Sequence, residues 1–143
     1  MDVKRTGHSV WRIEYHFVWI PRYRHAVLRG LLAKRLYALL TADVPEHHPD
    51  WQTIRLAVEP DHVHWLMSAP PKYAPSDIMR VVKAVTSRIL MAEFPSLRER
   101  YWDATLWSDG FFISAVGPVS EEAVKHYIQF QQRSDLRQQR LRL

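Results

Sequence analysis

The strongest constraint on the fold is an alternation of side chains over residues 10–20. Apolar residues occupy every second position of this stretch, and most positions between them are polar. Successive side chains of a β-strand point to opposite faces of its sheet, so the pattern predicts a strand with one apolar face. We expect that face to lie in a core or at a subunit interface. Its members are Trp11, Ile13, Tyr15, Phe17 and Trp19, opposite Arg12, Glu14 and His16.

The middle of the chain alternates between helical and strand patterns. Leucines recur at helical spacing over residues 28–41, which predicts a helix, whereas residues 45–50 are polar and turn-like. Residues 51–58 and 62–68 are predicted strands. Only Glu59, Pro60 and Asp61 separate them, so we expect these two strands to form a hairpin.

The last part of the chain predicts a helix, a strand and a second helix. Residues 75–94 form an amphipathic helix with an apolar stripe, and residues 111–116 read as a strand. Ser120 can cap a final helix that runs to about residue 132, and the arginine-rich tail at 133–143 is expected to fray. The stripe of the first of these helices consists of Ile78, Val81, Val82, Val85 and Ile89, with Lys83 and Arg88 off it.

The predicted order is strand, helix, strand, strand, helix, strand, followed by one more helix. This order is typical of the α+β class and of the ferredoxin-like βαββαβ plan, an antiparallel sheet with helices on one side. The first and third strands are central neighbours in that plan, so His16 is expected close to the third strand. At 143 residues the chain is expected to be a single domain over residues 1–143.

Composition narrows the possible function classes. Hydrophobic residues make up 47% and charged residues 24%, a balance that argues against disorder. A formal charge of +5 is compatible with a polyanionic partner, and the absence of cysteine excludes disulfides, thiolate zinc sites and cysteine nucleophiles. Neither a membrane span nor an export signal is recognisable in the sequence, so we expect a cytoplasmic protein without membrane contact.

The first candidate site is a pair of histidines in the third predicted strand. His62 and His64 are two residues apart, so they share a sheet face and could together bind one metal ion. Asp61 precedes them and could fix the tautomer of one ring by a hydrogen bond. Such a pair also occurs simply as two polar residues on a wet sheet face.

The second candidate site lies on the last predicted helix. Tyr127 and Gln131 are four residues apart and share a helix face. A tyrosine hydroxyl can attack an electrophile covalently, and an amide oxygen could be a third ligand beside two imidazoles. Imidazoles suit zinc, nickel or iron, whereas amide and phosphate oxygens suit Mg²⁺ or Mn²⁺. Periodicity alone does not bring this helix to the histidines, and a helical tyrosine is more often a packing residue.

Several separated motifs resemble one family. The stretch Pro60-Asp61-His62-Val63-His64-Trp65-Leu66 is similar to the HUH motif, histidine–hydrophobic–histidine, of single-strand DNA endonucleases. The chain as a whole resembles the single-tyrosine transposases (TnpA type) of small insertion sequences that move as single-stranded DNA. The other matching stretches include Tyr15-His16-Phe17-Val18-Trp19, Leu106-Trp107-Ser108 and Phe111-Phe112-Ile113-Ser114, whereas Asp109-Gly110 departs from the family pattern.

The resemblance implies an enzymatic mechanism. Tyr127 would attack a phosphodiester of single-stranded DNA, become joined to the 5′ phosphate and release a free 3′ hydroxyl. That hydroxyl would attack a second phosphotyrosine, which rejoins strands. His62, His64 and Gln131 would hold a divalent metal, for which we expect Mg²⁺ or Mn²⁺.

The resemblance also implies partners. Relatives bind DNA hairpins at the ends of the element and act as homodimers whose sheets join. The tyrosine helix of one subunit can complete the site of the other, with Gly117 and Pro118 as the hinge. Arg22, Arg24, Lys83 and Arg88 are the candidate DNA-contact residues, although each could also be a solvated charge.

Two alternatives stay open at this point. A domesticated relative that processes repeated palindromes would use the same nuclease chemistry. A non-catalytic module of the RRM kind would have a similar sheet with aromatic residues on its exposed face. The second alternative is disfavoured, because Trp65 shares a face with Val63 and Met67 rather than with the histidines.

Overall fold

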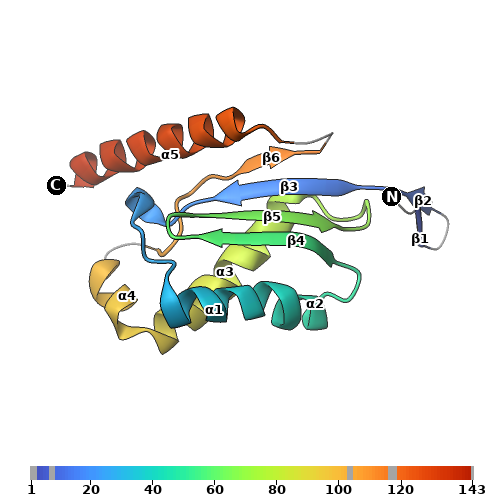
Figure 1. The fold of residues 1–143 in the computed structure, drawn as a ribbon, viewed down its shortest axis with the longest axis horizontal. Helices are drawn as coiled ribbons and strands as arrows, with labels where there is room; N and C mark the ends of the chain where they lie inside the picture. Colours follow the sequence, from blue (N-terminus) through green and yellow to red (C-terminus); the bar gives the residue numbers. More distant parts are fainter. Residues whose placement is uncertain (1–2, 7–8, 103–104, 116–118, 143) are drawn as a thin grey trace.

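A computed structural model describes residues 3–6, 9–102, 105–115 and 119–142. Two short strands come first, and a four-stranded sheet with its helices follows (Figure 1). A 3-10 turn at Arg22–Arg24 follows β3, and a π-helical turn at Leu39–Asp43 joins α1 to α2. The strands are β1 Lys4–Thr6, β2 Ser9–Trp11, β3 Glu14–Trp19, β4 Gln52–Glu59, β5 His62–Ser68 and β6 Phe112–Ser114. The helices are α1 Gly30–Ala38, α2 Val44–His47, α3 Pro75–Glu93, α4 Pro95–Arg100 and α5 Glu121–Arg142.

The main sheet confirms the predicted plan. Its order is β4-β5-β3-β6, and each neighbouring pair is antiparallel. The predicted hairpin is formed by β4 and β5, and the first and third strands of the plan, β3 and β5, are central neighbours. The βαββαβ prediction is therefore correct.

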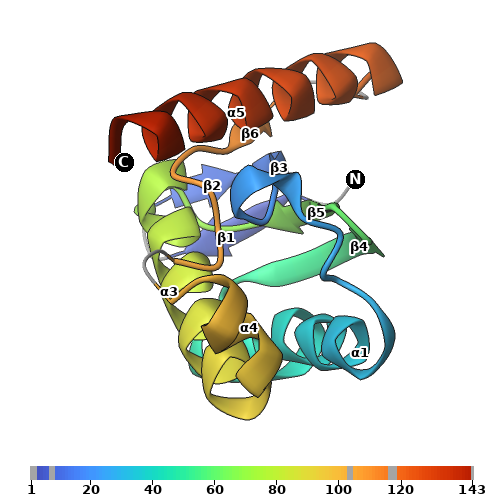
Figure 2. The same ribbon diagram turned by 90° about the vertical axis from the view of Figure 1, so that its left-hand side faces the viewer.

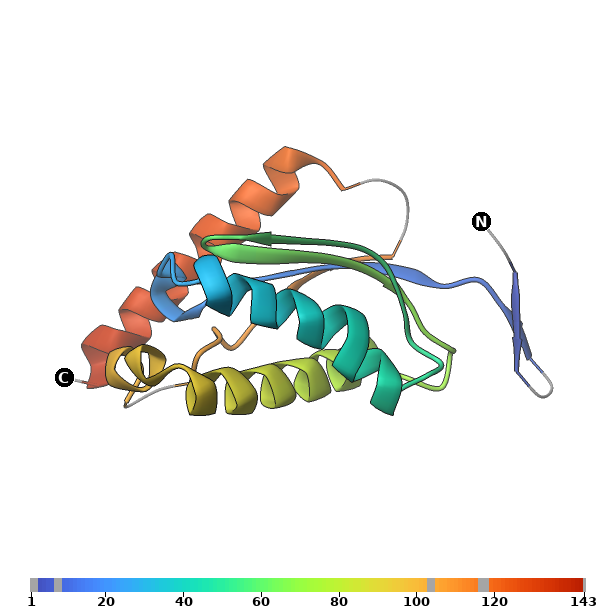
Figure 3. The ribbon, with the colours of Figure 1, turned by 60° about the horizontal axis from the view of Figure 1, so that its bottom comes forward.

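The helices lie on two sides of this sheet. α1 and α3 cover one face, whereas α5 lies on the other side, near β6 (Figures 1 and 2). The β1–β2 pair projects beyond the end of the main sheet (Figure 3). One sheet face is thus packed against α1 and α3, and α5 lies on the side of the opposite face.

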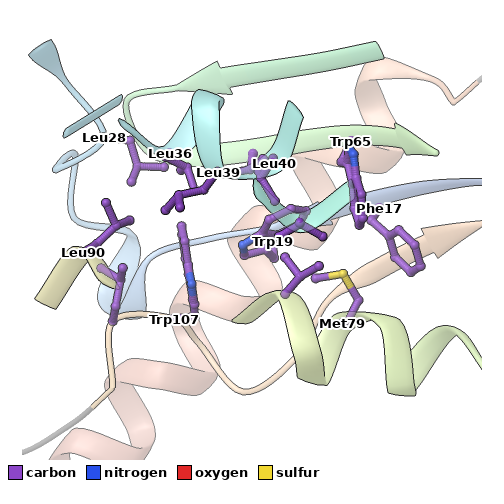
Figure 4. Close-up of a cluster of buried hydrophobic side chains, with 14 of the residues drawn as sticks. Phe17, Trp19, Leu28, Leu36, Leu39, Leu40, Trp65, Met79, Leu90 and Trp107 are labelled. Carbon is purple, nitrogen blue, oxygen red and sulfur yellow. The ribbon is translucent and has the colours of Figure 1, made fainter. Parts of the chain in front are cut away.

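The core lies between the sheet and α1 and α3. Phe17, Trp19 and Trp65 are at most 1% exposed and meet side chains of α1 and α3 there, as Figure 4 shows. Burying each large apolar side chain contributes about 1.5–3 kcal/mol, so these aromatic residues anchor β3 and β5 firmly. The predicted core face of β3 is confirmed at Phe17 and Trp19, and Trp65 presents no exposed aromatic surface.

The single strand predicted over residues 10–20 is wrong. The structure divides it into β2 and β3, and β2 pairs with β1 instead of with the main sheet. The last pair between β3 and β5 joins Glu14 to Ser68. Beyond Ser68 the chain reaches Pro70 and Pro71, which have no N–H to donate, so β5 offers no further ladder to residues 10–13.

Two details of the helices also differ from prediction. The turn-like segment at 45–50 begins as the short helix α2, because Pro45 lies in its first turn, where no N–H donor is needed. The predicted stripe of α3 is confirmed at Ile78 and Val82, which are buried, and at Val81 and Ile89, which pack against the core. The buried face also includes Met79, Thr86 and Leu90, which the stripe did not contain. Thr86 fits there because its hydroxyl accepts a hydrogen bond from the Trp107 indole at 2.9 Å.

The prediction that the chain frays after residue 132 is wrong. α5 begins after Ser120, whose hydroxyl accepts a hydrogen bond from the Ala123 N–H as predicted, and it continues to Arg142. The continuation is stabilised by buried contacts of Asp135, which is 1% exposed. Gln138 also accepts a hydrogen bond from Arg22 at 3.1 Å.

Candidate active site

His62 and His64 lie on the sheet face that α1 and α3 leave uncovered. Val63 and Trp65 point into the core, so the alternation of β5 turns both histidines the other way. On β3, His16 lies opposite Leu66 and Val18 lies opposite His64, which puts His16 on the same side. We call this side, with His16, His62 and His64, the histidine face.

Asp61 links the histidine face to the turn at Arg22–Arg24. Its Oδ1 lies 2.9 Å from the Nδ1 of His62, and its Oδ2 accepts a hydrogen bond from Arg24 Nε at 2.8 Å. Burial alone would raise the pKa of Asp61, but the bonds to His62 and Arg24 outweigh it and lower that pKa. The carboxylate is therefore ionised and orients the His62 ring so that Nε2 is the atom left for a ligand.

His64 is held next to His16. The Nε2 of His64 lies 3.4 Å from the Nδ1 of His16, and the two ring centroids are 5.6 Å apart. Burial, together with the charges of His16, His62 and Arg55, lowers the pKa of His64. A neutral imidazole is the form that binds a metal, so this environment favours a ligand role.

Tyr127 lies on the same side of the sheet, two strands away. Its ring contacts Phe112 of β6 at a centroid distance of 6.2 Å, and Phe112 pairs with Val18, which pairs in turn with His64. The Tyr127 hydroxyl is buried and has no hydrogen-bond partner among the described residues. Burial, and to a lesser degree the charge of Asp135, raises the pKa of Tyr127 above its ordinary value.

Gln131 is held by residues outside the histidine face. It is 6% exposed, and its Nε2 donates a hydrogen bond to Asp135 at 3.2 Å. Its Oε1 lies against Gly110, so close that a Cβ at that glycine would be 2.5 Å from it. The structure thus brings His62 and His64 together and Tyr127 near Gln131, but it does not bring the two pairs into contact.

Asp135, which helps to hold α5 in this position, is not among the site residues predicted from the sequence. Asp135 accepts hydrogen bonds from the Ser108 hydroxyl, from the Tyr23 N–H at 2.9 Å and from Gln131. We call Asp135, Ser108, Gln131 and the Tyr23 N–H the Asp135 cluster. An aspartate in an otherwise basic helical segment was the only sequence signal, and it is a weak one.

The turn that receives α5 has an unusual backbone. Tyr23 and Arg24 have φ angles of 63° and 57°, in the left-handed region that non-glycine residues rarely adopt. Such a residue costs of order 1–3 kcal/mol and persists only where its surroundings hold it. Here Asp135 binds the N–H of Tyr23, and Asp61 binds the side chain of Arg24. The turn therefore connects the histidine face to the Asp135 cluster.

The predicted DNA-contact residues have different surroundings. Arg22 is 3% exposed and binds Asp109 at 2.9 Å and Gln138. Arg24 is partly exposed and also reaches Gln132 at 3.4 Å. Arg24 thus keeps accessible surface beside the histidine face, whereas the buried Arg22 guanidinium already binds Asp109 and Gln138.

The two predicted DNA-contact residues of α3 differ as well. The Lys83 ammonium donates to the carbonyl oxygens of Ser108 and Gly110, each at 2.7 Å. Burial lowers the pKa of Lys83 to about 8, although Asp109 and Asp135 act in the opposite direction. Arg88 is exposed and lines a cavity of about 460 Å³ together with Lys83. DNA contact by any of these four residues stays a prediction.

Three further observations concern the predicted hinge, the predicted metal site and the expected absence of a membrane span. Gly117 and Pro118, the predicted hinge, lie outside the described residues. Within the described ranges, no group of three His, Asp or Glu side chains is already arranged to hold a metal ion, and no helix is long and apolar enough to cross a membrane. A metal site on the histidine face would therefore need some reorientation of side chains.

Comparison with known proteins identifies the family. The family model for IS200-like transposases matches residues 9–131. The ISDra2 transposase TnpA of Deinococcus radiodurans is 32% identical over 131 residues, which is 92% of each chain. The transposase for insertion sequence element IS200 of Salmonella typhimurium is 27% identical over 137 residues, covering 94% of this chain and 86% of that protein.

A solved structure agrees with these relatives. The crystal structure of a proposed transposase from Deinococcus radiodurans R1 is 29% identical, with a TM-score of 0.81 over 90% of this chain and 97% of that one. The family match spans β2 to the middle of α5, and it therefore includes both histidines, Tyr127 and Gln131. The chain belongs to the IS200-like transposase family.

Proposed function

We propose that this transposase is a metal-dependent single-stranded DNA endonuclease and strand transferase with Tyr127 as its nucleophile. Tyr127 attacks a phosphodiester, forms a 5′-phosphotyrosine and releases a 3′ hydroxyl, and strand transfer then rejoins the ends. The observation that supports this best is the arrangement of the histidine face. Two partly exposed imidazoles lie side by side there, the pKa of His64 is lowered, and the tyrosine helix lies over the neighbouring strands on the same side.

The donor set of the histidine face fits a divalent cation. The Asp61 carboxylate binds His62 through Nδ1, a common arrangement for a metal-binding histidine. A lowered pKa keeps His64 neutral at physiological pH. A cation such as Mg²⁺ or Mn²⁺ held there by His62 and His64 would polarise the phosphodiester and stabilise charge that develops in the transition state.

The chain's own residues have distinct tasks in this proposal. The Tyr127 oxygen forms the new bond to phosphorus and gives its proton to water, while the bond between phosphorus and the 3′ oxygen breaks and that oxygen takes up a proton to leave as a hydroxyl. Arg24, between Asp61 and solvent, is suited to hold a backbone phosphate beside the histidines. Asp61 fixes the His62 ring and so keeps its free nitrogen directed toward the site.

α5 has to change position before this reaction can occur. The Tyr127 hydroxyl is buried without a hydrogen-bond partner in the described part of the chain, and Gln131 is bound to Asp135. We propose that DNA binding releases the Asp135 cluster, which lets Tyr127 approach the histidines and frees Gln131 to become a third ligand. The approach can take place within one subunit or across a homodimer with joined sheets, with Gly117 and Pro118 as the hinge.

The DNA substrate in this proposal is a hairpin at an end of the mobile element. A chain with a formal charge of +5 can bind the phosphates of such a hairpin through its shape and backbone. Arg24 and Arg88 are the better-exposed of the predicted contact residues, so we expect them to contribute more to DNA affinity than Arg22 does.

The test is formation of a covalent protein–DNA adduct. A labelled hairpin oligonucleotide taken from DNA flanking the gene is incubated with the protein and Mg²⁺ or Mn²⁺, and adducts are separated on a denaturing gel. We expect an adduct with the wild-type chain and none with Tyr127→Phe. His64→Ala should reduce adduct formation by at least about 100-fold, because the imidazole pair is broken.

Tyr37→Phe is the matched control, because Tyr37 is half-exposed on α1, on the other side of the sheet. It should form the adduct at the wild-type rate. An adduct that persists in Tyr127→Phe, or DNA binding with no adduct under either metal, contradicts the proposal. Recovery of rejoined strands, beyond simple cleavage, supports the strand-transfer step.

A further inference from the structure

The third histidine of the histidine face has no role in the proposed reaction so far. His16 lies on β3, the neighbour of β5, where Phe17 and Trp19 are anchored in the core. Because Phe17 and Trp19 point into the core, the alternation of β3 puts the His16 side chain on the opposite face, diagonal to His64. Both histidines are therefore positioned by central strands of a rigid sheet rather than by loops.

The distance between His16 and His64 suggests what they can do together. The Nδ1 of His16 and the Nε2 of His64 are 3.4 Å apart. This is long for a hydrogen bond, whose donor and acceptor are usually about 2.7–3.2 Å apart. Two imidazole nitrogens that bind Zn²⁺ tetrahedrally at about 2.0–2.1 Å lie roughly 3.3–3.4 Å from each other. The observed separation thus matches that of two ligands of one cation.

The chemistry of the surrounding residues agrees with this. The His64 atom that faces His16 is Nε2, and His62 also has Nε2 left for a ligand because Asp61 occupies its Nδ1. All three rings lie on one face of two adjacent strands. Three imidazoles in that arrangement are a recurrent ligand set for a divalent cation with one or more open positions.

We propose that His16 is a further protein ligand of the divalent cation, which it binds together with His64 and His62 while Gln131 is still held in the Asp135 cluster. This inference rests on the proposed metal site of the transposase. His62 has to reorient to complete the set, because no three ligands are yet arranged around one point within the described residues. The cation would then be resident before α5 moves, and Gln131 would join or replace a ligand afterwards.

The first test counts imidazoles around a bound ion. The full-length protein is loaded with one equivalent of Zn²⁺ in the absence of DNA, and X-ray absorption fine structure gives the number of histidine ligands. We expect three for the wild-type chain and two for His16→Gln. Two in both proteins would overturn the inference, because His16 would then be only a neighbour of His64.

The second test measures affinity for Mn²⁺ by the loss of its free-ion paramagnetic resonance signal. In the absence of DNA, His16→Gln should weaken Mn²⁺ binding at least tenfold, whereas Gln131→Ala should weaken it less, because Gln131 is bound to Asp135 in that state. His47→Gln is the control, because His47 is an exposed residue of α2, which is not part of the histidine face. Melting curves of each variant show whether it is folded.

The outcomes separate this inference from the proposed function. If His64→Ala weakens Mn²⁺ binding and His16→Gln does not, the metal site stands and the role of His16 is refuted. If neither substitution has an effect, the metal site itself is refuted. If Gln131→Ala weakens binding as much as His16→Gln does, the order of events proposed for α5 is wrong.

Discussion

The histidine face and the Asp135 cluster hold the two halves of one candidate site in different ways. His62 and His64 extend from a central strand whose other side chains are packed in the core. Tyr127 and Gln131 lie on a helix that is held near them by polar contacts of Asp135. Apolar packing fixes the first half, whereas the second half combines the apolar contacts of Ile128 and Tyr127 with hydrogen bonds that other donors could replace. We therefore expect α5, which carries Tyr127 and Gln131, to be the half that can move.

The largest expected effect comes from Asp135→Asn. The substitution removes a buried negative charge that accepts bonds from Ser108, Tyr23 and Gln131, and we expect a loss of about 2–4 kcal/mol in the free energy of unfolding. Hydrogen exchange should accelerate in α5 and stay unchanged in β5. Glu121→Gln, an exposed change on the same helix, serves as the control. Equal acceleration in both elements would contradict a separately held helix.

Lys83→Met tests the loop at residues 108–110, whose carbonyl oxygens accept hydrogen bonds from the Lys83 ammonium. We expect this substitution to lower the free energy of unfolding. The folded-state pKa of Lys83 is about 8, below its usual value of 10.5, so the folded protein releases this proton first as pH rises. The lysine's contribution to stability is therefore smallest below pH 8 and is complete above pH 10.5. The stability difference between the wild-type chain and Lys83→Met should grow by roughly 3 kcal/mol across that window. A difference independent of pH would contradict the assignment.

Asp61→Asn tests the histidine face. The folded-state pKa of Asp61 is lowered from 3.8, so the unfolded chain takes up the proton first and stability falls as pH drops below about 3.8. The asparagine variant should lack this part of the acid sensitivity and should be about 1 kcal/mol less stable at pH 7. Denaturant titrations at several pH values measure both effects. Identical acid sensitivity of the two proteins would show that the carboxylate is not paired as described.

The smallest expected effect belongs to Gly110→Ala. Its new methyl group would meet Gln131 Oε1 at 2.5 Å, but that atom is the end of a flexible side chain that can turn aside. We expect a stability loss of less than about 1 kcal/mol, with Gln131 displaced from Asp135. The Gln131 amide resonances in an NMR spectrum report this displacement. Unshifted resonances would mean that the close contact does not hold Gln131 in place.

Periodicity and turn residues were sufficient to predict most of the sheet. The alternation around Phe17 and Trp19 and the hairpin between β4 and β5 are local patterns, so the order of strands followed from the general plan. These local patterns did not predict where β3 begins, because its first residue, Glu14, is set by the end of β5 at Ser68. That partner lies more than 50 residues away in the sequence.

The candidate site was predictable only in its strand-borne half. Two residues of spacing put His62 and His64 on one face, and the topology brought His16 next to them. The position of α5 was not predictable, since it depends on Asp135 meeting Ser108 and the N–H of Tyr23. Helical periodicity assigns Asp135 to a helix face, but it does not say what that face will contact.

The most direct test of the account measures whether α5 moves when the tyrosine reacts. The chain has no cysteine, so Gln129→Cys on α5 and Arg55→Cys on β4, both exposed, allow two spin labels to be attached selectively. Dilution with excess unlabelled protein ensures that the measured distances are between labels of the same subunit. Pulsed electron paramagnetic resonance should give one distance between the two spin labels in the free protein and a different distance once hairpin DNA and Mg²⁺ are bound. An unchanged distance in protein that has formed the Tyr127 adduct would contradict the account.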